Sequence, residues 1–454
     1  MPILSLNRDR ERGAPLPWWL TLLDVLGVVL PLLALNALLI GGFRLRSETL
    51  VLSLTSWQRL TFWSVVVLSA RHLLVPRPAL PQRLAFWRGR PPGSFRLADA
   101  VVMGAGTRLA LLLLGYLATV VIGGPSDAPT TGGWVSWALP PGCEGWRHIR
   151  VAREGYAGAG MDVTVFPALG LLLRGSERAL AVPPPVAGLA IAIASFVGAM
   201  FYMYRLARID VGHGAALASI ALLAAFPGSL AHSLVSVEPL FLLAAVGAFW
   251  HVRRGEWVRA SAWGLVLGLT RPGGFLVALP LAVVAGWRPS REAAPRITSL
   301  SRALVPAAAP VVGLLIALTY SAGGAGIFGA VPSPRVLETA ESLVQVANQG
   351  LLPTVSRAPL AVLDALSAVF ALAVVWPITR RFGPAYGLFV LVGLLGSVLF
   401  GGEATIGRQT AVLFPLFLWM GAAVPAPHRF GWISLFALTQ GLAAVLFFTR
   451  RGQW

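Results

Sequence analysis

Residues 259–287 read RASAWGLVLGLTRPGGFLVALPLAVVAGW, and this stretch decides how the chain is organised. It is apolar on both sides of TRPGG, residues 270–274, whose proline and two glycines can end one helix and open another. Basic clusters lie at its two ends: Arg253, Arg254 and Arg259 at the start, and Arg288, Arg291, Arg296 and Arg302 after it. Because such clusters stay on the cytoplasmic side of a membrane, the chain between them must cross an even number of times. We therefore predict two short helices that meet near the outer side.

The composition excludes a water-soluble globular protein. The 454 residues are 56% hydrophobic and only 12% charged, whereas soluble domains carry about 25% charged residues. Apolar runs near membrane-spanning length recur along the whole chain, which predicts an all-α polytopic membrane protein of about thirteen transmembrane helices. Besides the two short helices, the predicted spans are 18–40, 58–75, 99–123, 186–206, 213–231, 239–251, 303–320, 360–378, 383–401, 409–424 and 432–449.

The net charge of +18 comes from 36 basic and 18 acidic residues, and every basic residue is arginine. Most of these arginines lie between apolar runs, where they orient the chain in the bilayer, so nucleic acid is not an expected partner. The long loops 124–185 and 321–359 then fall outside. Exclusive use of arginine hints at a GC-rich bacterial genome and so favours the bacterial cytoplasmic membrane. Residues 41–57 partly alternate and can form a small extended hairpin or a segment that lies on the membrane surface.

Two carboxylates stand out because ionisable groups near an apolar core need a reason to be there. Glu144 begins a stretch with an apolar stripe that predicts a short amphipathic helix on the membrane. A carboxylate at such a helix start suits a general base, although a helix-capping acid fits the pattern too. Glu238 lies between Pro227 and Pro239, which suggests helix ends that converge at a cavity, and it can also pair structurally with an arginine. Asp162 is a further acid in the first long loop.

Arg271 and Arg408 follow short segments near the outer side. A guanidinium at such a place matches the geometry of phosphate oxygens, while the alternative is contact with lipid headgroups. His148 and His232 lack tight metal-ligand spacing and are read as hydrogen-bonding residues near these acids, and the single cysteine, Cys143, cannot build a cysteine-rich metal site. No nucleotide-binding glycine motif is present, so no metal and no cofactor is predicted.

Four sequence blocks, from about residue 100 onward, resemble bacterial relatives of the PIG-V mannosyltransferases, within the GT-C class of polytopic glycosyltransferases. They are CEGWRHIRVAREGY (143–156), VFPALGLLLR (165–174), the central pair FPGSLAHSLVSVEPLFLL (226–243) and RRGEWVRASAWGLVLGLTRPGG (253–274), and GRQTAVLFPLF (407–417). Glu144 stands where the family has Asp, and Gln409 replaces the usual Tyr. Residues 99–454 would form the GT-C-like core. Residues 1–98 would be an extension with two transmembrane helices and a basic cytoplasmic loop.

The resemblance implies an inverting transferase that takes a sugar, most simply mannose, from a polyprenyl-phosphate donor. The acceptor would be a lipid, glycan or protein at the outer face. Glu144 would be the general base, Arg271 and Arg408 would bind the donor phosphate, and Glu238 would position an arginine or a sugar hydroxyl. Asp162, His148 and His232 would lie near the substrates.

Two other functions fit parts of the pattern. Buried arginines and broken helices also mark transporters, so a flippase of a lipid-linked anion is one alternative. The departures from the family pattern at Cys143, Glu144 and Gln409 favour the second, a catalytically inactive scaffold.

Overall fold

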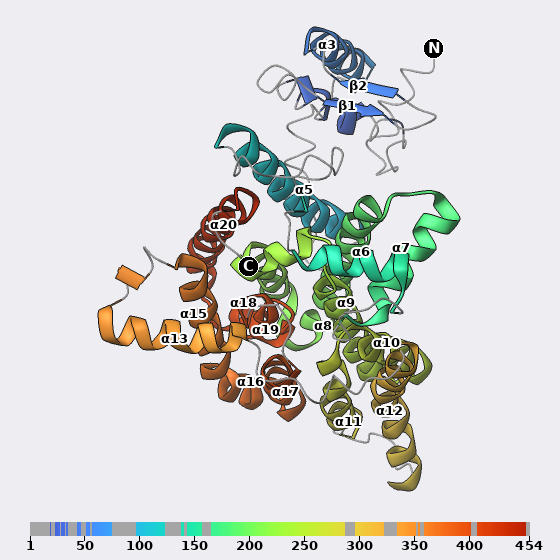
Figure 1. Cartoon of the computed structure of the whole chain (residues 1–454), viewed down its shortest axis with the longest axis vertical. Helices are drawn as coiled ribbons and strands as arrows, with labels where there is room; N and C mark the ends of the chain where they lie inside the picture. Colours follow the sequence, from blue (N-terminus) through green and yellow to red (C-terminus); the bar gives the residue numbers. More distant parts are fainter. Residues whose placement is uncertain are drawn as a thin grey trace, which may run out of the picture. The chain divides into compact units, whose positions relative to one another are not determined.

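The computed structural model divides into two compact units, Met1–Ser94 and Phe95–Trp454, close to the boundary predicted at residue 98 (Figure 1). In the first unit the structure describes residues 19, 23–27, 29–31, 33–34, 43–46, 51–54 and 57–74. In the second it describes residues 97–122, 138–139, 143–156, 165–286, 296–321, 334–350, 353–354, 358–400 and 406–450.

The first unit contains the hairpin that the alternating pattern at 41–57 predicts. Strands β1 (Phe43–Arg46) and β2 (Val51–Leu54) are antiparallel, with Phe43 opposite Leu54. The predicted span 58–75 is helix α3 (Trp57–Leu74), and only part of the predicted span 18–40 is described. Arg71 of α3 is buried and pairs with Asp24 at 2.8 Å, so a residue within 18–40 neutralises the charge that this apolar helix carries.

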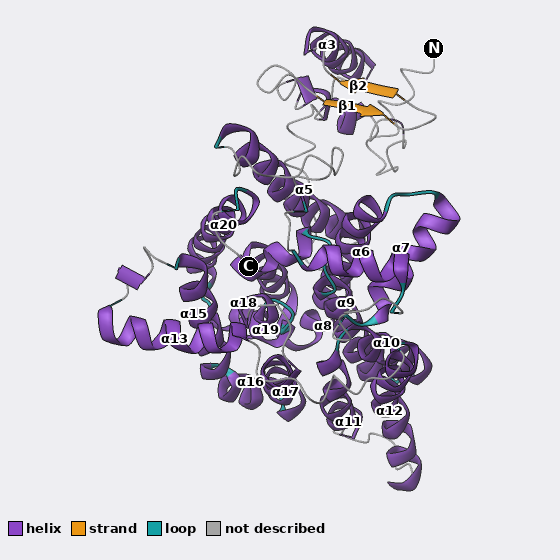
Figure 2. Ribbon diagram, viewed as in Figure 1, coloured by secondary structure: helices purple, strands orange, loops and turns teal. Residues whose placement is uncertain are grey.

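Every element of regular secondary structure described in the second unit is a helix (Figure 2). These elements, in chain order with the short 3₁₀ helices labelled η, are α5 (Leu97–Val121), α6 (Glu144–Glu154), α7 (Pro167–Leu180), α8 (Pro184–Ala225), η3 (Pro227–Ser233), α9 (Glu238–Arg254), α10 (Trp257–Thr270), η4 (Pro272–Val277), α11 (Ala278–Gly286), α12 (Arg296–Tyr320), α13 (Pro334–Gln349), α15 (Pro359–Ala373), α16 (Val375–Phe382), α17 (Pro384–Phe400), α18 (Ile406–Thr410), α19 (Phe414–Ala423) and α20 (Ala426–Phe448).

The described residues form a helical membrane protein, but the predicted count of thirteen spans is too high. Three helices, α5, α8 and α20, are long and apolar enough to cross a bilayer, and the number rises to five if each of two bent helix pairs is one span. The remaining apolar helical stretches in the described part of the chain have 10–17 residues, which is too short for a full crossing. The predicted span 409–424, for example, is divided into α18 and the ten-residue α19.

The predicted pair of short helices around TRPGG is confirmed. Helix α10 ends at Thr270, Arg271 has extended backbone, and α11 follows the 3₁₀ turn η4. The predicted spans 186–206 and 213–231 are joined in α8, which is divided only at Gly212 (φ 76°, ψ 177°). A positive φ is easily adopted only by glycine, so this residue lets the chain change direction without a loop.

Helix α9 lies at the centre of the second unit, and this position fixes the place of Glu238. Nearly all its residues are buried, and Phe249 packs edge-on against Phe389 of α17 and Phe414 of α19. The chain enters α9 from η3 through a bend of 102°. Phe226 before Pro227 is extended, as residues before proline prefer, so α8 ends there and η3 begins. Glu238, the first residue of α9, therefore lies at a helix break.

The basic residues Arg253, Arg254 and Arg259 around the turn between α9 and α10 predict that this turn lies on the cytoplasmic side. In a Cys143→Ser background, a cysteine at Val258, an exposed residue at the start of α10, should resist a membrane-impermeant thiol reagent applied to intact cells. A cysteine at Glu154, exposed at the end of α6, should react. Labelling of Val258→Cys from outside would reverse the orientation.

Candidate active site

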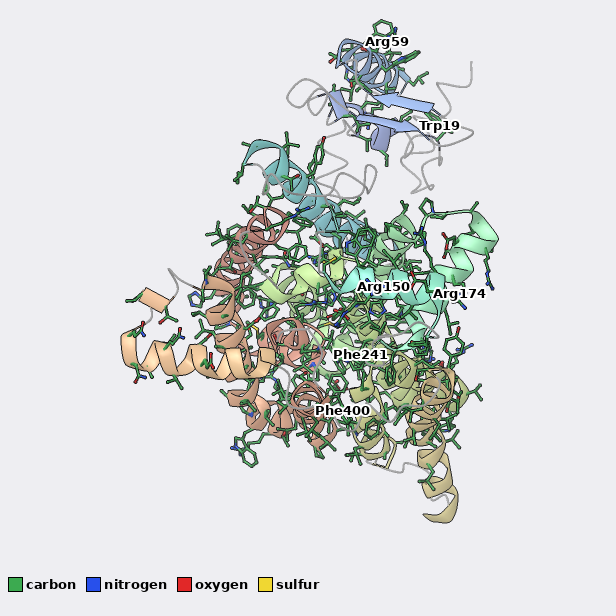
Figure 3. The ribbon with its side chains drawn as sticks, viewed as in Figure 1. Trp19, Arg59, Arg150, Arg174, Phe241 and Phe400 are labelled. Atoms are coloured by element: carbon green, nitrogen blue, oxygen red, sulfur yellow. The ribbon has the colours of Figure 1, made fainter. Side chains whose placement is uncertain are left out.

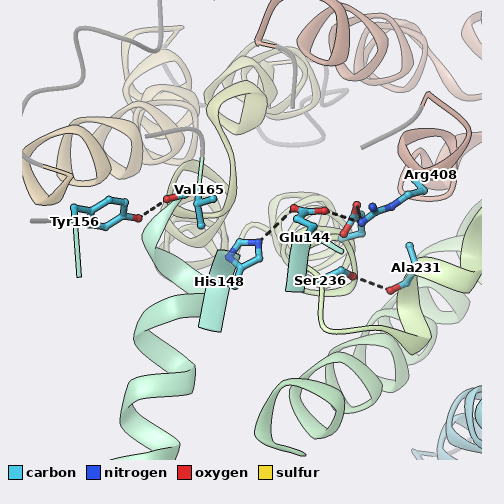
Figure 4. A network of polar contacts seen from close by, with 8 residues as sticks. Glu144, His148, Tyr156, Val165, Ala231, Ser236 and Arg408 are labelled. Carbon is cyan, nitrogen blue, oxygen red and sulfur yellow. Dashed lines mark hydrogen bonds and ion pairs between the residues drawn. The ribbon is translucent and has the colours of Figure 1, made fainter. Parts of the chain in front are cut away.

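The candidate site centres on one arginine that binds two carboxylates. The Nη2 atom of Arg408 donates to Glu144 Oε2 at 2.8 Å and to Glu238 Oε1 at 2.6 Å. The three residues come from α18, α6 and α9, and the acids are 264 and 170 positions from Arg408 in sequence. The Arg408 and Glu238 side chains are 6% and 1% exposed, so this is a buried ionic cluster (Figure 4).

Close backbone packing brings α18 to the start of α9. A Cβ on Gly228 of η3 would lie 2.3 Å from the carbonyl oxygen of Gly407, so only glycine allows this approach. Arg408 follows Gly407 directly and thereby lies beside Glu238. In the structure Arg408 is buried on the short helix α18.

Helix α6 carries the second carboxylate and is held by α7. Its predicted amphipathic character is confirmed, since Ile149, Val151 and Ala152 are buried while Glu154 is exposed. Arg174 of α7 donates from Nε to the carbonyl of Ala152 at 2.6 Å, which satisfies the end of α6 (Figure 3). These contacts fix the helix whose first residue is Glu144.

A cleft of about 70 Å³ opens next to the ionic cluster. Its polar lining comes from Glu144, Arg147, Glu238, Arg271 and Gln409. Much of the remaining wall is apolar or glycine-rich, and it includes Phe241, Val277, Phe389, Gly393, Gly396 and Phe400 (Phe241 and Phe400 are labelled in Figure 3). Arg408 lines a smaller cavity that Cys143 and Ser236 also line. The two carboxylates thus face the large cleft, with Arg408 bound to both.

Of the two arginines predicted to bind phosphate, Arg271 lines this cleft. It lies at the break between α10 and η4, where its Nη1 donates to the side-chain oxygen of Gln409. Its guanidinium carbon is 3.6 Å from the centroid of the Phe241 ring, a cation–π contact. Gln409 follows Arg408 in α18. One predicted arginine therefore belongs to this helix, and the other, Arg271, forms a hydrogen bond to it.

The ionic cluster holds Glu144 in its charged form. Burial alone would raise the pKa of its carboxyl, but Arg408 and the neighbouring His148 outweigh that effect and lower the pKa to about 2. The same carboxylates raise the pKa of Arg408, so its guanidinium stays charged. The site therefore holds two negative groups and one positive group in contact, with Arg271 adding a second positive group at the cleft.

Of the other predicted site residues, His148 lies beside Glu144, whereas His232 does not line the cleft. His148 lies one helical turn after Glu144, with its Nε2 3.4 Å from Glu144 Oε1. His232 is fully buried and stacks on Phe196 at 4.9 Å, and it is not among the residues that line the cleft. Asp162 lies outside the described residues. Within the part of the chain that the structure describes, no group of three His, Cys, Asp or Glu side chains is arranged to hold a metal ion.

Arg108, which was not predicted as a site residue, supports the chain segment that precedes Glu238. This fully buried residue of α5 donates to the backbone carbonyls of Ala224 and Ser229, at the end of α8 and in η3. Gln440 of α20 donates to the carbonyl of Phe226 in the same segment at 2.7 Å. These three bonds hold the segment in which α8 ends and η3 begins, before Glu238. An arginine inside a 25-residue apolar helix was the signal available in the sequence.

Comparison with known proteins gives no relative. No family model matches the chain, and no curated protein is significantly similar to it.

Proposed function

We propose that the chain is a membrane glycosyltransferase of the GT-C type. It would move a sugar, most simply mannose, from a polyprenyl-phosphate donor to a hydroxyl of a lipid, glycan or protein acceptor at the outer face of a bacterial cytoplasmic membrane. One observation carries this proposal: Glu144, Glu238 and Arg271, from three distant segments, line one cleft whose remaining wall is largely apolar. A lipid-linked sugar phosphate needs a cation for its phosphate and an apolar surface for its chain.

In this reaction Glu144 is the general base. Its carboxylate accepts the proton of the acceptor hydroxyl, while the hydroxyl oxygen forms a bond to the anomeric carbon of the sugar. The bond from that carbon to the donor phosphate oxygen breaks on the opposite side, and polyprenyl phosphate leaves with the electron pair. The configuration at the carbon is inverted. A positioned general base typically contributes about 10²- to 10⁴-fold.

The two arginines have separate parts in this proposal. A guanidinium has five N–H groups, and Arg271 uses one for Gln409, so others can bind the donor phosphate and offset its growing charge. Arg408 orients Glu144 and Glu238 by binding both. Glu238 Oε2 is buried without a hydrogen-bond partner in the described structure and can accept from a sugar hydroxyl.

The direct test uses purified protein in proteoliposomes with polyprenyl-phosphate mannose carrying a labelled sugar. We expect transfer of label to an acceptor, or slow hydrolysis without one, and neither reaction with Glu144→Gln. Translocation of intact donor without bond cleavage would identify a flippase. Donor binding without either reaction would identify an inactive scaffold.

Arg271→Lys should impair donor use almost as much as Arg271→Ala. Lysine keeps the charge but cannot keep the planar contact with Phe241, the bond to Gln409 and a two-pronged contact with phosphate together. The measurement is KM for the labelled donor. Arg153→Lys is the control, because Arg153 is an exposed residue of α6 that pairs with Glu177 at 3.5 Å. A wild-type KM for Arg271→Lys would mean that Arg271 supplies only diffuse charge.

A further inference from the structure

A second cavity lies at the other end of α9, away from Glu238. Its volume is about 650 Å³, and its lining includes Arg205 and Arg208 of α8, Arg254 of α9 and Arg259 of α10. Helix α9 has 17 residues between Glu238 and Arg254, which corresponds to about 25 Å. The cavity is therefore separate from the candidate active site.

The arginines of this cavity outnumber its acids. Glu256 is its one lining carboxylate, and it already accepts from Arg254 at 2.7 Å, Arg259 at 2.9 Å and His251 at 2.7 Å. Arg205 pairs with no carboxylate in the described part of the chain. The cavity therefore carries excess positive charge that its own acid does not neutralise.

Aromatic rings hold two of these guanidinium groups in place. The guanidinium carbon of Arg205 lies 4.5 Å from the ring centroid of Phe201 and 5.8 Å from that of Trp250. The guanidinium carbon of Arg254 lies 5.4 Å from the Trp250 ring. A guanidinium fixed in this way loses less freedom when it binds an anion, and its planar edge suits phosphate oxygens.

Apolar surface beside the cavity indicates that its ligand has an apolar part. Ile209, which lines the cavity, is 53% exposed, and Val258, the neighbour of Arg259, is 83% exposed. Trp250 and the nearby tyrosines Tyr202 and Tyr204 are residue types that gather at the headgroup level of membranes.

We propose that this cavity binds the phosphate of an anionic phospholipid headgroup, with the acyl chains beside Ile209 and Val258. The arginines supply charge-assisted hydrogen bonds to the phosphate, and the aromatic rings keep the guanidinium groups oriented. This site does not depend on the proposed transferase activity. Free phosphate has the same charged chemistry, so the experiment compares the two sources.

The test is native mass spectrometry of the full-length protein in detergent, titrated with phosphatidylglycerol or with phosphatidylcholine of the same acyl chains. We expect wild type to bind phosphatidylglycerol preferentially. The double variant Arg205→Gln/Arg254→Gln should bind phosphatidylglycerol about 30-fold more weakly. Each arginine near an anionic lipid contributes a factor of about 5 to 6 in affinity, and the two factors multiply. Phosphatidylcholine binding should not change.

The matched control is Arg380→Gln/Arg381→Gln in the last turn of α16. The positive-inside rule places this basic pair on the cytoplasmic side too, and the pair does not line the cavity. Equal weakening in both double variants would overturn the proposal in favour of diffuse attraction. Competition by millimolar inorganic phosphate would overturn it in favour of a soluble phosphate ligand. If the arginine variant does not fold, Ile209→Glu at the exposed cavity wall replaces it, and unchanged phosphatidylglycerol binding there would also overturn the proposal.

Discussion

Arg408→Gln should lower the free energy of unfolding by about 3–5 kcal/mol, because it leaves two carboxylates without the cation they share. Glu238 is 1% exposed and Glu144 18% exposed, so neither gains full hydration in return. The measurement is thermal unfolding of the purified protein in detergent at pH 7, where the variant should melt several degrees lower. Arg153→Gln, which removes an exposed ion pair, is the control and should cost about 1 kcal/mol or less.

The pH dependence of this effect has a defined sign. In wild type the pKa of Glu144 is lowered to about 2, so its contribution to stability is present above its ordinary value of 4.5 and is lost as pH falls toward 2. Without Arg408, the burial that raises the pKa of Glu144 loses its main opposing effect. The variant should therefore become more stable relative to wild type as pH falls from 7 to 5.

A triple variant separates charge from packing. Glu144→Gln/Glu238→Gln/Arg408→Gln removes all three charges together and should recover most of the stability, since a buried ionic cluster often adds little net stability. Wild-type melting of the single Arg408→Gln variant would contradict the ionic cluster itself. Failure of the triple variant to recover would assign the loss to packing around α18.

Local patterns in the sequence predict local structure well in this protein. TRPGG predicts the break between α10 and η4, since proline and glycine act on the backbone where they stand. The apolar stripe after Glu144 predicts α6, and the alternation at 41–57 predicts β1 and β2. The span count is wrong because average hydropathy does not detect the breaks that shorten helices such as α19.

The contact of Arg408 with Glu144 and Glu238 could not be predicted from local sequence patterns. No periodicity links Glu144 to Arg408 across 264 positions, and the contact depends on the close approach of Gly228 to Gly407. The sequence pattern predicts the same role for Arg271 and Arg408, whereas of these two only Arg271 lines the large cleft. Gln409, which departs from the resembled family, accepts a hydrogen bond from Arg271 and so has a place in this site.

Glu144→Gln should lower kcat for sugar transfer by about two to four orders of magnitude, because the amide cannot accept a proton. Arg408 keeps its bond to Glu238 in this variant, so the fold and the affinity for donor should remain close to wild type. The measurements are initial rates with labelled polyprenyl-phosphate mannose and, separately, donor binding at equilibrium. Glu154→Gln is the matched control, since it makes the same change at the exposed end of the same helix.

Two further measurements test Glu144 as the base: the pH dependence of kcat/KM and the activity of Glu144→Asp. Because the pKa of Glu144 is about 2 in the free protein, the acidic limb of kcat/KM that reports this residue should lie below about pH 4. Glu144→Asp keeps the charge but withdraws the carboxylate by one methylene from Arg408, so it should also lose activity through misplacement. Near-normal kcat in Glu144→Gln would remove this residue from the chemistry. Glu238, whose Oε2 is buried without a hydrogen-bond partner among the described residues beside the same cleft, would then be the base to test.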